Sequence, residues 1–178
     1  ILNPDGDGIG EIAAKGPMVM KGYYKMPEET AKMFTEDGWF KTGDLGKIDK
    51  EFYVTLCGRA KNMIVTSGGK NVYPEEIEDA FQLCDDIQQI VVQGYTTKED
   101  ETSEEIEALI YPSDSAYEAL GQKREEDFNS AQINQRIQNE VSKVNKTLQP
   151  YARITRITIL ENPLEMTTTK KIKRNYKK

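Results

Sequence analysis

The sequence predicts an α+β fold in which a small C-terminal α/β sandwich follows a β-rich segment. From about residue 59 the expected elements run β-α-β-β-α-β, an order typical of a sheet with its helices on one face. Before that point, short stretches of strand-forming residues alternate with glycine and polar turns. We therefore divide the 178 residues into two parts, 1–58 and 59–178.

The first part is expected to contain three strands and one short helix. A turn with Pro4, Gly6 and Gly8 leads into a strand around Ile12. The stretch "PEETAKMF" predicts a helix, because Pro27 suits a first helical turn and two acids follow it. "WFKTGDLGKID" and "FYVTLCG" predict two further strands joined by polar turns.

The second part opens with a short strand and a glycine turn, followed by a helix that begins at Pro74. One face of that helix is expected to be apolar, and its residues are Ile77, Ala80, Phe81 and Cys84. "IQQIVVQGY" and "IEALIYP" predict two strands. The acidic connection between them is expected to be a hairpin loop in solvent, with Glu99, Asp100, Glu101, Glu104 and Glu105.

The clearest helix covers about residues 130–148. Its apolar residues recur every three or four positions, namely Ile133, Ile137, Val141, Val144 and Leu148. This stripe predicts core packing. The alternating stretch "ITRITILEN" predicts a last strand, and Pro163 begins the segment that leads to a basic tail.

Composition excludes several classes of protein. With 30 Asp and Glu against 24 Lys and Arg, the net charge of −6 argues against a nucleic-acid partner. There is no histidine, so the usual general base and a common zinc ligand are both missing. Cys57 and Cys84 are expected to be reduced thiols. No signal peptide or membrane-spanning run is evident, so a cytoplasmic location is expected.

Two stretches suit nucleotide chemistry. Asp44, in "FKTGDLG", follows a Thr-Gly turn and could accept hydrogen bonds from both hydroxyls of a ribose, although an aspartate that only stabilises the turn is the competing interpretation. "GRAKNMIVTSGGKN" surrounds two glycines with cations. Its spacing does not fit a Walker loop, so a ligand-facing turn and an ordinary β-turn both stay open.

The tail "TTTKKIKRNYKK" also allows two interpretations. Six of the last nine residues are Lys or Arg. They could form a solvated segment attracted to anionic surfaces, including a peripheral membrane contact. Alternatively, one lysine acts chemically, because an ammonium can hold a carboxylate and a phosphate oxygen together while charge moves between them.

Taken in order, five motifs resemble the closing third of the adenylate-forming superfamily of acyl-CoA synthetases, luciferases and adenylation domains. They are "GEIAAKGPMVMKGYY", "PEETA", "DGWFKTGDLG", "GRAKNMIVTSGGKNVYPEEIE" and "TTTKKIKR". The likeness is strongest to bacterial long-chain fatty-acid CoA ligases. It implies a two-step reaction in which a fatty acid and Mg-ATP form an acyl-adenylate, and the thiol of coenzyme A then displaces AMP.

The resemblance implies roles for single residues. Lys171 matches the adenylation lysine, and Asp44 matches the carboxylate that holds the ribose hydroxyls. Arg59 matches an arginine near ribose and phosphate, and Lys61 matches the hinge position. The remaining positions match the pantetheine passage and a basic site near phosphates of ATP or coenzyme A, and they are Gly68, Gly69 and Lys70. The other cations of the tail are expected only to solubilise it or to attract anions weakly: Lys170, Lys173 and Arg174.

The sequence also departs from the family pattern. Val65 stands where some relatives carry a lysine, Phe52 replaces a frequent turn glycine, and Lys170 replaces the glycine that often precedes the adenylation lysine. The family's Ser/Thr/Gly-rich phosphate loop and acyl pocket are missing. We therefore expect residues 1–58 to end a large N-terminal domain that is the partner of the mobile domain 59–178, and we expect this fragment to be inactive alone.

Two alternatives remain at this stage. The enzyme could pass its acyl group to a carrier-protein arm or to oxygen instead of coenzyme A. The chain could also be a non-catalytic binding module, in which case its affinity for anionic surfaces should fall steeply with salt.

Overall fold

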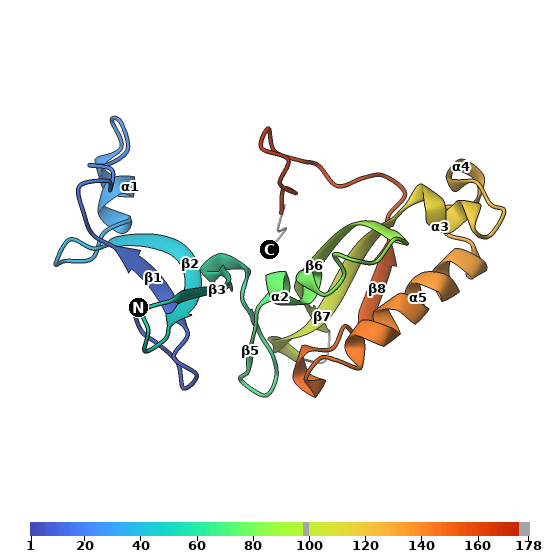
Figure 1. Cartoon of the computed structure of the whole chain (residues 1–178), viewed down its shortest axis with the longest axis horizontal. Coiled ribbons are helices and arrows are strands. Elements are labelled where there is room, and N and C mark those ends of the chain that lie inside the picture. The colour runs from blue at the N-terminus through green and yellow to red at the C-terminus, as the bar shows by residue number, and fades with distance from the viewer. Residues whose placement is uncertain (98–99, 175–178) are drawn as a thin grey trace. The chain divides into compact units, whose positions relative to one another are not determined.

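The computed structural model describes residues 1–97 and 100–174 (Figure 1). The chain forms two compact units, Ile1–Met63 and Ile64–Lys178. The first unit thus extends past residue 58, because the short 3-10 helix η1 (Ala60–Asn62) continues from the preceding strand and buries Asn62.

The first unit is built on an antiparallel sheet in the order β1-β2-β3. Its elements are β1 (Gly10–Ala14), α1 (Pro27–Lys32), β2 (Phe40–Ile48) and β3 (Val54–Arg59). Helix α1 begins where proline fits the first turn and two glutamates favour the N-terminal dipole. The three strands and the short helix expected from the sequence are therefore present.

The β2–β3 hairpin leaves apolar side chains exposed. Its exposed apolar side chains are Ile48, Phe52, Tyr53, Val54 and Leu56. In the hairpin turn, Phe52 has a φ of 67°. Glycine adopts this left-handed conformation with the least strain, so the sequence departure at Phe52 lies at a position that favours glycine.

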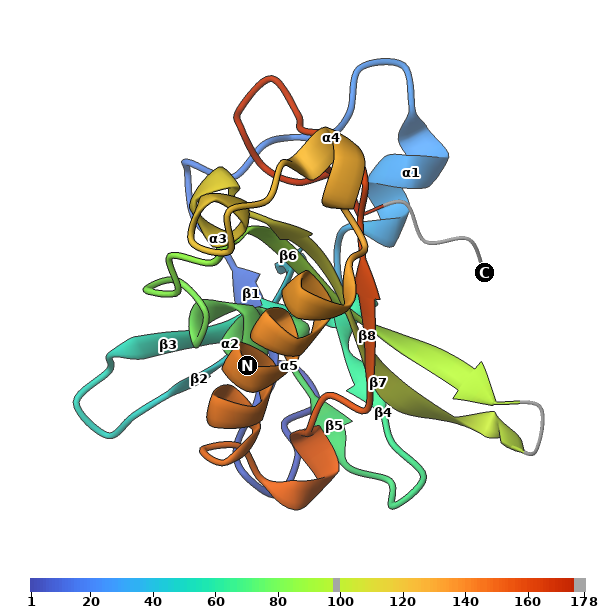
Figure 2. The ribbon, with the colours of Figure 1, turned by 90° about the vertical axis from the view of Figure 1, so that its right-hand side faces the viewer.

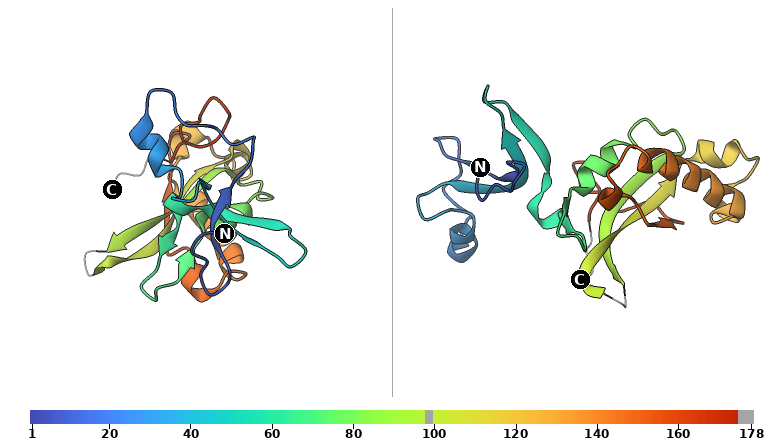
Figure 3. Two further views of the ribbon diagram at one scale, coloured as in Figure 1. Left: turned by 90° about the vertical axis from the view of Figure 1, so that its left-hand side faces the viewer. Right: turned by 90° about the horizontal axis from the view of Figure 1, so that it is seen from below.

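The second unit contains a three-stranded sheet in the order β6-β7-β8. β6 (Ile87–Thr97) and β7 (Asp100–Pro112) are antiparallel, and β8 (Arg156–Ile159) runs parallel to β7. Two short strands, β4 (Ile64–Val65) and β5 (Asn71–Val72), form a separate hairpin. The ribbon of β6 and β7 extends beyond the helices (Figures 2 and 3).

Helices cover one face of this sheet. Val92, Ala108 and Ile110 project from that face into a core shared with two helices, α2 (Pro74–Asp79) and α5 (Ala131–Asn145). The predicted stripe of α5 is confirmed, since Ile133, Ile137 and Val141 are buried. The shorter elements α3 (Asp114–Glu118) and η2 (Pro150–Ala152) add residues to this core, and α4 (Arg124–Asp127) buries none.

Several sequence-based expectations for this unit were wrong in detail. The acidic residues from Asp100 to Glu105 belong to β7 and do not form a loop, whereas Glu99 lies outside the described residues. A strand that extends beyond the covering helices needs no apolar face, so the sequence pattern of this acidic stretch did not indicate a strand. Helix α2 ends at Asp79, which leaves Ala80 exposed in a turn. Helices α3 and α4 are too short to show a period.

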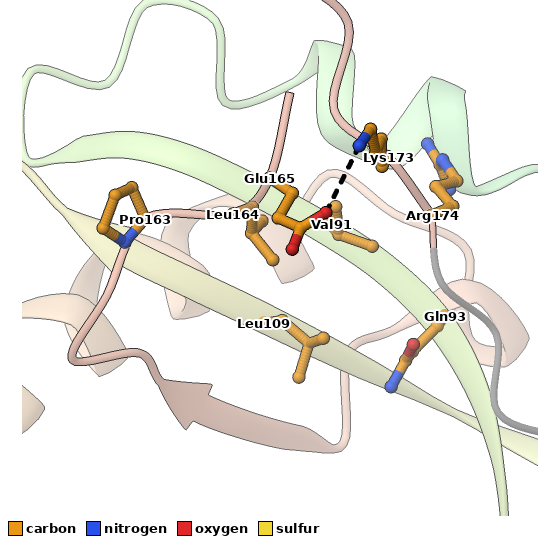
Figure 4. A pocket seen from close by; sticks show the side chains of 8 residues that line it. All are labelled: Val91, Gln93, Leu109, Pro163, Leu164, Glu165, Lys173 and Arg174. Atoms are coloured by element: carbon orange, nitrogen blue, oxygen red, sulfur yellow. Dashed lines mark hydrogen bonds and ion pairs between the residues drawn. The ribbon is translucent and has the colours of Figure 1, made fainter. Parts of the chain in front are cut away.

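The opposite face of the sheet is covered by the chain that follows β8. Val91 and Leu109 pair across β6 and β7 and line a cavity of about 230 Å³ together with Pro163 and Leu164 (Figure 4). The backbone N–H of Leu164 donates to Oε1 of Gln89 at 2.7 Å. The segment leading to the tail is therefore attached to the sheet.

Candidate functional site

The two units each hold part of the predicted site. Asp44, Arg59 and Lys61 lie in the first unit. The second unit holds the glycine loop and the basic tail, with Gly68, Gly69, Lys70 and Lys171.

Asp44 and Arg59 form an ion pair. They are register partners on β2 and β3, and Nη1 of Arg59 lies 2.9 Å from Oδ1 of Asp44 and 3.1 Å from the carbonyl oxygen of Thr42. The Asp44 side chain is 39% exposed, so its carboxylate can still accept hydrogen bonds from a ligand. The arrangement presents an acceptor for hydroxyls beside a guanidinium that suits a phosphate.

The backbone around Asp44 is held firmly. Gly43 has a φ of 73°, and its N–H donates to Oε1 of Glu11 at 3.0 Å. The hydroxyl of Thr42 donates to the carbonyl oxygen of Ile12 at 2.7 Å and accepts from the N–H of Asp44 at 3.1 Å. Thr42 and Gly43 thus lie within β2 and do not form the turn expected from the sequence, and these bonds hold the part of the strand that carries Asp44.

Lys61 lies in η1, close to Met63, the last residue of the first unit. Its side chain is exposed. A residue at the junction of two compact units is a suitable place for a hinge. The hinge role itself stays a prediction.

The glycine loop between β4 and β5 is a three-residue hairpin turn. The N–H of Thr66 donates to the carbonyl oxygen of Lys70 at 3.0 Å, and the N–H of Gly69 donates to that of Thr66 at 2.8 Å. Gly69 has a φ of 66°, as this turn requires. Gly68 has no such requirement, and a Cβ at Gly68 would meet no atom within 4 Å. The described chain thus gives no packing reason for Gly68, which leaves its backbone open to a ligand.

The tail repeats the same hairpin turn. The N–H of Thr167 donates to the carbonyl oxygen of Lys171 at 2.7 Å, and the N–H of Lys170 donates to that of Thr167 at 2.9 Å. Lys170 occupies the position equivalent to Gly69, with a φ of 58°. The sequence departure at Lys170 therefore places a non-glycine residue in a left-handed conformation, at a cost of about 1–2 kcal/mol.

This turn presents Lys171 with an uncommitted charge. Its side chain is exposed, and within residues 1–97 and 100–174 its ammonium has no hydrogen bond or ion pair. Lys173, two positions later, is instead 3.4 Å from Oε2 of Glu165 on the other side of the hairpin. Lys171 can therefore bind an external anion without first losing an internal partner.

Arg174 is the residue whose role the sequence interpretation missed. It is neither solubilising nor free to attract anions, because its side chain is only 14% exposed and forms an ion pair with Glu78 on α2. Glu75 lies 3.7 Å away, and Nη1 donates to the carbonyl oxygen of Val92 at 3.2 Å. The motif "YPEEIE" contains both acids, but only the fold shows that they meet the tail.

Burial raises the pKa of Glu78 to about 7, and the N–H of Val92 and the charge of Arg174 oppose that rise. The unfolded chain has the ordinary pKa of about 4.5, so the folded chain binds the extra proton between these values. This contribution to stability is fully present below pH 4.5 and is lost as the pH rises through 7.

We expect this loss to lower the free energy of unfolding of the second unit by at most about 3 kcal/mol between pH 4.5 and pH 8. Urea unfolding of the chain and of its Glu78→Gln variant at several pH values measures it. The stability difference between the two proteins should change with pH across this window. A difference that is independent of pH would contradict the assignment.

The described residues do not build a metal site. No group of three or more His, Cys, Asp or Glu side chains in that part of the chain is arranged to hold an ion. Likewise, no helix among the described residues is long and apolar enough to cross a membrane.

The chain is similar to known long-chain-fatty-acid–CoA ligases. The chain is 49% identical over 85 residues to a long-chain-fatty-acid–CoA ligase of Bacillus subtilis, a match that covers 48% of this chain and 15% of the relative. It is 43% identical over 99 residues to the long-chain-fatty-acid–CoA ligase ACSBG2 of Gallus gallus, covering 55% and 13%. The matches thus span well under a fifth of these relatives.

Solved structures with the same fold carry nucleotides. ATP-bound MatB from Rhodopseudomonas palustris is 32% identical, with a TM-score of 0.68 over 95% of this chain and 29% of that one. The A domain of a carboxylic acid reductase from Segniliparus rugosus, in complex with AMP and a carboxylic acid, is 25% identical, with a TM-score of 0.77 over 93% and 26%. The family described as "AMP-binding enzyme C-terminal domain" matches residues 61–177. The chain therefore belongs to this family of C-terminal domains of adenylate-forming enzymes.

Proposed function

We propose that this chain supplies the closing third of a long-chain fatty-acid CoA ligase. Residues 1–63 form the end of a large nucleotide-binding domain, and residues 64–178 form the mobile lobe. The substrates are a fatty acid, ATP and coenzyme A, and the products are an acyl-CoA, AMP and pyrophosphate. The uncommitted ammonium of Lys171, held on an ordered hairpin, is the observation that carries this proposal.

In the first half-reaction, a carboxylate oxygen of the fatty acid attacks the α-phosphorus of ATP and the bond to pyrophosphate breaks. The nucleophile is already ionised, so no general base is needed, which suits a chain without histidine. Lys171 neutralises the charge that gathers on the carboxylate and the phosphoryl oxygens. Asp44 holds the ribose hydroxyls, and Arg59 lies beside it near the phosphate.

In the second half-reaction, the thiolate of coenzyme A attacks the acyl carbonyl carbon and the bond to AMP breaks. The mobile lobe turns about Lys61, withdraws Lys171 and brings the 66–70 loop to the passage for the pantetheine arm. The open backbone at Gly68 leaves room for that arm, and Lys70, which is exposed, attracts the phosphates.

A purely anion-attracting tail fits the structure less well. Lys173 and Arg174 are engaged with Glu165, Glu75 and Glu78, so half of the described cations after Thr169 are unavailable to a surface. A solvated tail also has no need of a paired hairpin. The ordered turn supports one positioned lysine.

The complete protein that contains this sequence tests the proposal. With a long-chain fatty acid, ATP and Mg²⁺, it should release pyrophosphate only when the fatty acid is present, and added coenzyme A should give acyl-CoA and AMP. The 178 residues alone should show no turnover. Absence of fatty-acid-dependent pyrophosphate release, or acyl-CoA formation by the isolated chain, would contradict it. Transfer to a carrier-protein arm but not to coenzyme A would change the acceptor.

A further inference from the structure

The tail is fastened to the second unit on both sides of Lys171. Before the hairpin, Leu164 bonds Gln89 through its backbone and packs in the cavity with Val91 and Leu109. After it, Arg174 reaches across to α2 and β6 (Figure 4). The hairpin that carries Lys171 is therefore attached to the second unit at both of its ends, which restricts its movement relative to that unit.

The attachment at Arg174 uses the free edge of the sheet. β6 is an edge strand, and around Val92 its N–H and carbonyl groups need partners other than β7. Oε1 of Glu78 accepts the Val92 N–H at 2.7 Å, while Arg174 donates to the Val92 carbonyl oxygen and to Glu78 Oε2. One carboxylate thus joins helix, strand and tail.

Only a planar guanidinium makes all of these contacts. Nη1 of Arg174 donates to the carbonyl oxygen of Val92, and Nη2 forms ion pairs with Glu75 and Glu78. The rigid plane of the guanidinium fixes the directions of these contacts. A lysine has a single charged nitrogen, which cannot reproduce the fork. Lys173, whose side chain is 48% exposed and whose ammonium lies 3.4 Å from Oε2 of Glu165, offers no comparable anchor.

We propose that Arg174 is a positioning residue for Lys171: by fixing the end of the hairpin on Glu78 and Val92, it sets where the Lys171 ammonium stands during adenylate formation. This inference rests on the proposed function. Arg174 lies three residues after Lys171, and the N–H of Lys173 donates to the carbonyl oxygen of Glu165 at 2.7 Å, so the hairpin itself stays closed when Arg174 is released. What the release removes is the attachment of the hairpin to α2 and β6, which leaves the attachment at Leu164. Catalytic geometry is sensitive to displacements of about 1 Å, which can cost roughly 100-fold in rate.

The test compares Arg174→Gln, Arg174→Lys and Lys171→Ala in the complete protein, with Lys173→Gln as the matched control from the same hairpin. Each variant is measured in fatty-acid-dependent pyrophosphate exchange and in acyl-CoA formation from supplied acyl-adenylate. We expect Arg174→Gln to lower kcat of the first reaction about 10- to 100-fold with little change in KM or in the second reaction. Arg174→Lys should restore part of the rate, and Lys173→Gln should match the parent.

The outcomes separate the two proposals. If Lys171→Ala slows exchange and Arg174→Gln does not, or if Arg174→Gln slows both half-reactions equally, the positioning role is wrong and the proposed function stands. If Lys171→Ala leaves exchange unchanged, the proposed function itself fails.

If the Arg174→Gln protein does not fold, a second variant tests the same inference. In Glu78→Gln the amide oxygen can still accept the Val92 N–H, but the charge is gone and an NH₂ group replaces the oxygen that accepts from Arg174, so this variant should also slow exchange selectively. Equal rates in Glu78→Gln and parent enzyme would overturn the inference. In a folded Arg174→Gln protein, the pKa of Glu78 followed by NMR should rise, because the opposing charge is gone.

Discussion

Replacing Lys171 with alanine is expected to slow acyl-adenylate formation by about 100- to 1,000-fold in the complete enzyme. The ammonium has no partner among the described residues, so its removal leaves no internal group unpaired and should not disturb the hairpin. The whole effect therefore falls on the external anion that the lysine neutralises. Pyrophosphate exchange measures the first half-reaction directly.

The same variant should form acyl-CoA from supplied acyl-adenylate at a nearly unchanged rate, because the lysine is withdrawn by then. Lys170→Ala is the matched control, because it also removes one exposed charge. Alanine at position 170 would have to adopt the same left-handed backbone conformation as the lysine. That control should keep both activities. Equal loss of the two half-reactions in Lys171→Ala would show that the side chain is not specific to adenylation.

Replacing Asp44 with alanine is expected to raise KM for ATP by about 10- to 100-fold, since hydrogen bonds to a charged acceptor contribute roughly 1.5–3 kcal/mol. The part of β2 that carries Asp44 is held by the Thr42 hydroxyl, which donates to Ile12, and by the Glu11 carboxylate, which accepts from Gly43, so the fold should persist. Asp7→Asn, an exposed aspartate of the same unit, provides the control and should behave as the parent does.

Deoxynucleotide substrates test whether Asp44 binds the ribose hydroxyls. If Asp44 accepts both ribose hydroxyls, 2′-deoxy-ATP and 3′-deoxy-ATP should be poorer substrates than ATP for the parent enzyme. In Asp44→Ala the preference should largely disappear, because the acceptor that distinguishes them is gone. A preference that survives the substitution would mean that another group holds the sugar.

The sequence was informative where chemistry is carried by residue type and order. The helical period of α5 and the strands around "FKTGDLG" predicted the framework, and the order of the motifs predicted the family. The roles of Lys171 and Asp44 stay predictions, and the sequence could suggest them because each residue lies in a local motif. Their surroundings also depend mainly on neighbours in the same hairpin or strand pair.

The sequence was least informative where residues far apart meet. In the sequence, Arg174 cannot be distinguished from the other cations of the basic tail. Only the fold brings it to Glu78, 96 positions earlier, at the free edge of β6. The acidic start of β7 was predicted as a loop for a different reason. Strand pairing is made by the backbone, so a ribbon that extends past the core can carry any side chain.

The central claim is that the second unit carries the Lys171 ammonium to the nucleotide for adenylation and removes it afterwards. The most direct measurement is a crystal structure of the complete polypeptide bound to a non-hydrolysable acyl-adenylate analogue. We expect Nζ of Lys171 within about 3 Å of a phosphate or acyl oxygen, with both ribose hydroxyls on Asp44. A well-defined complex in which the ammonium lies far from the phosphorus and the aspartate leaves the sugar unbound would contradict the account.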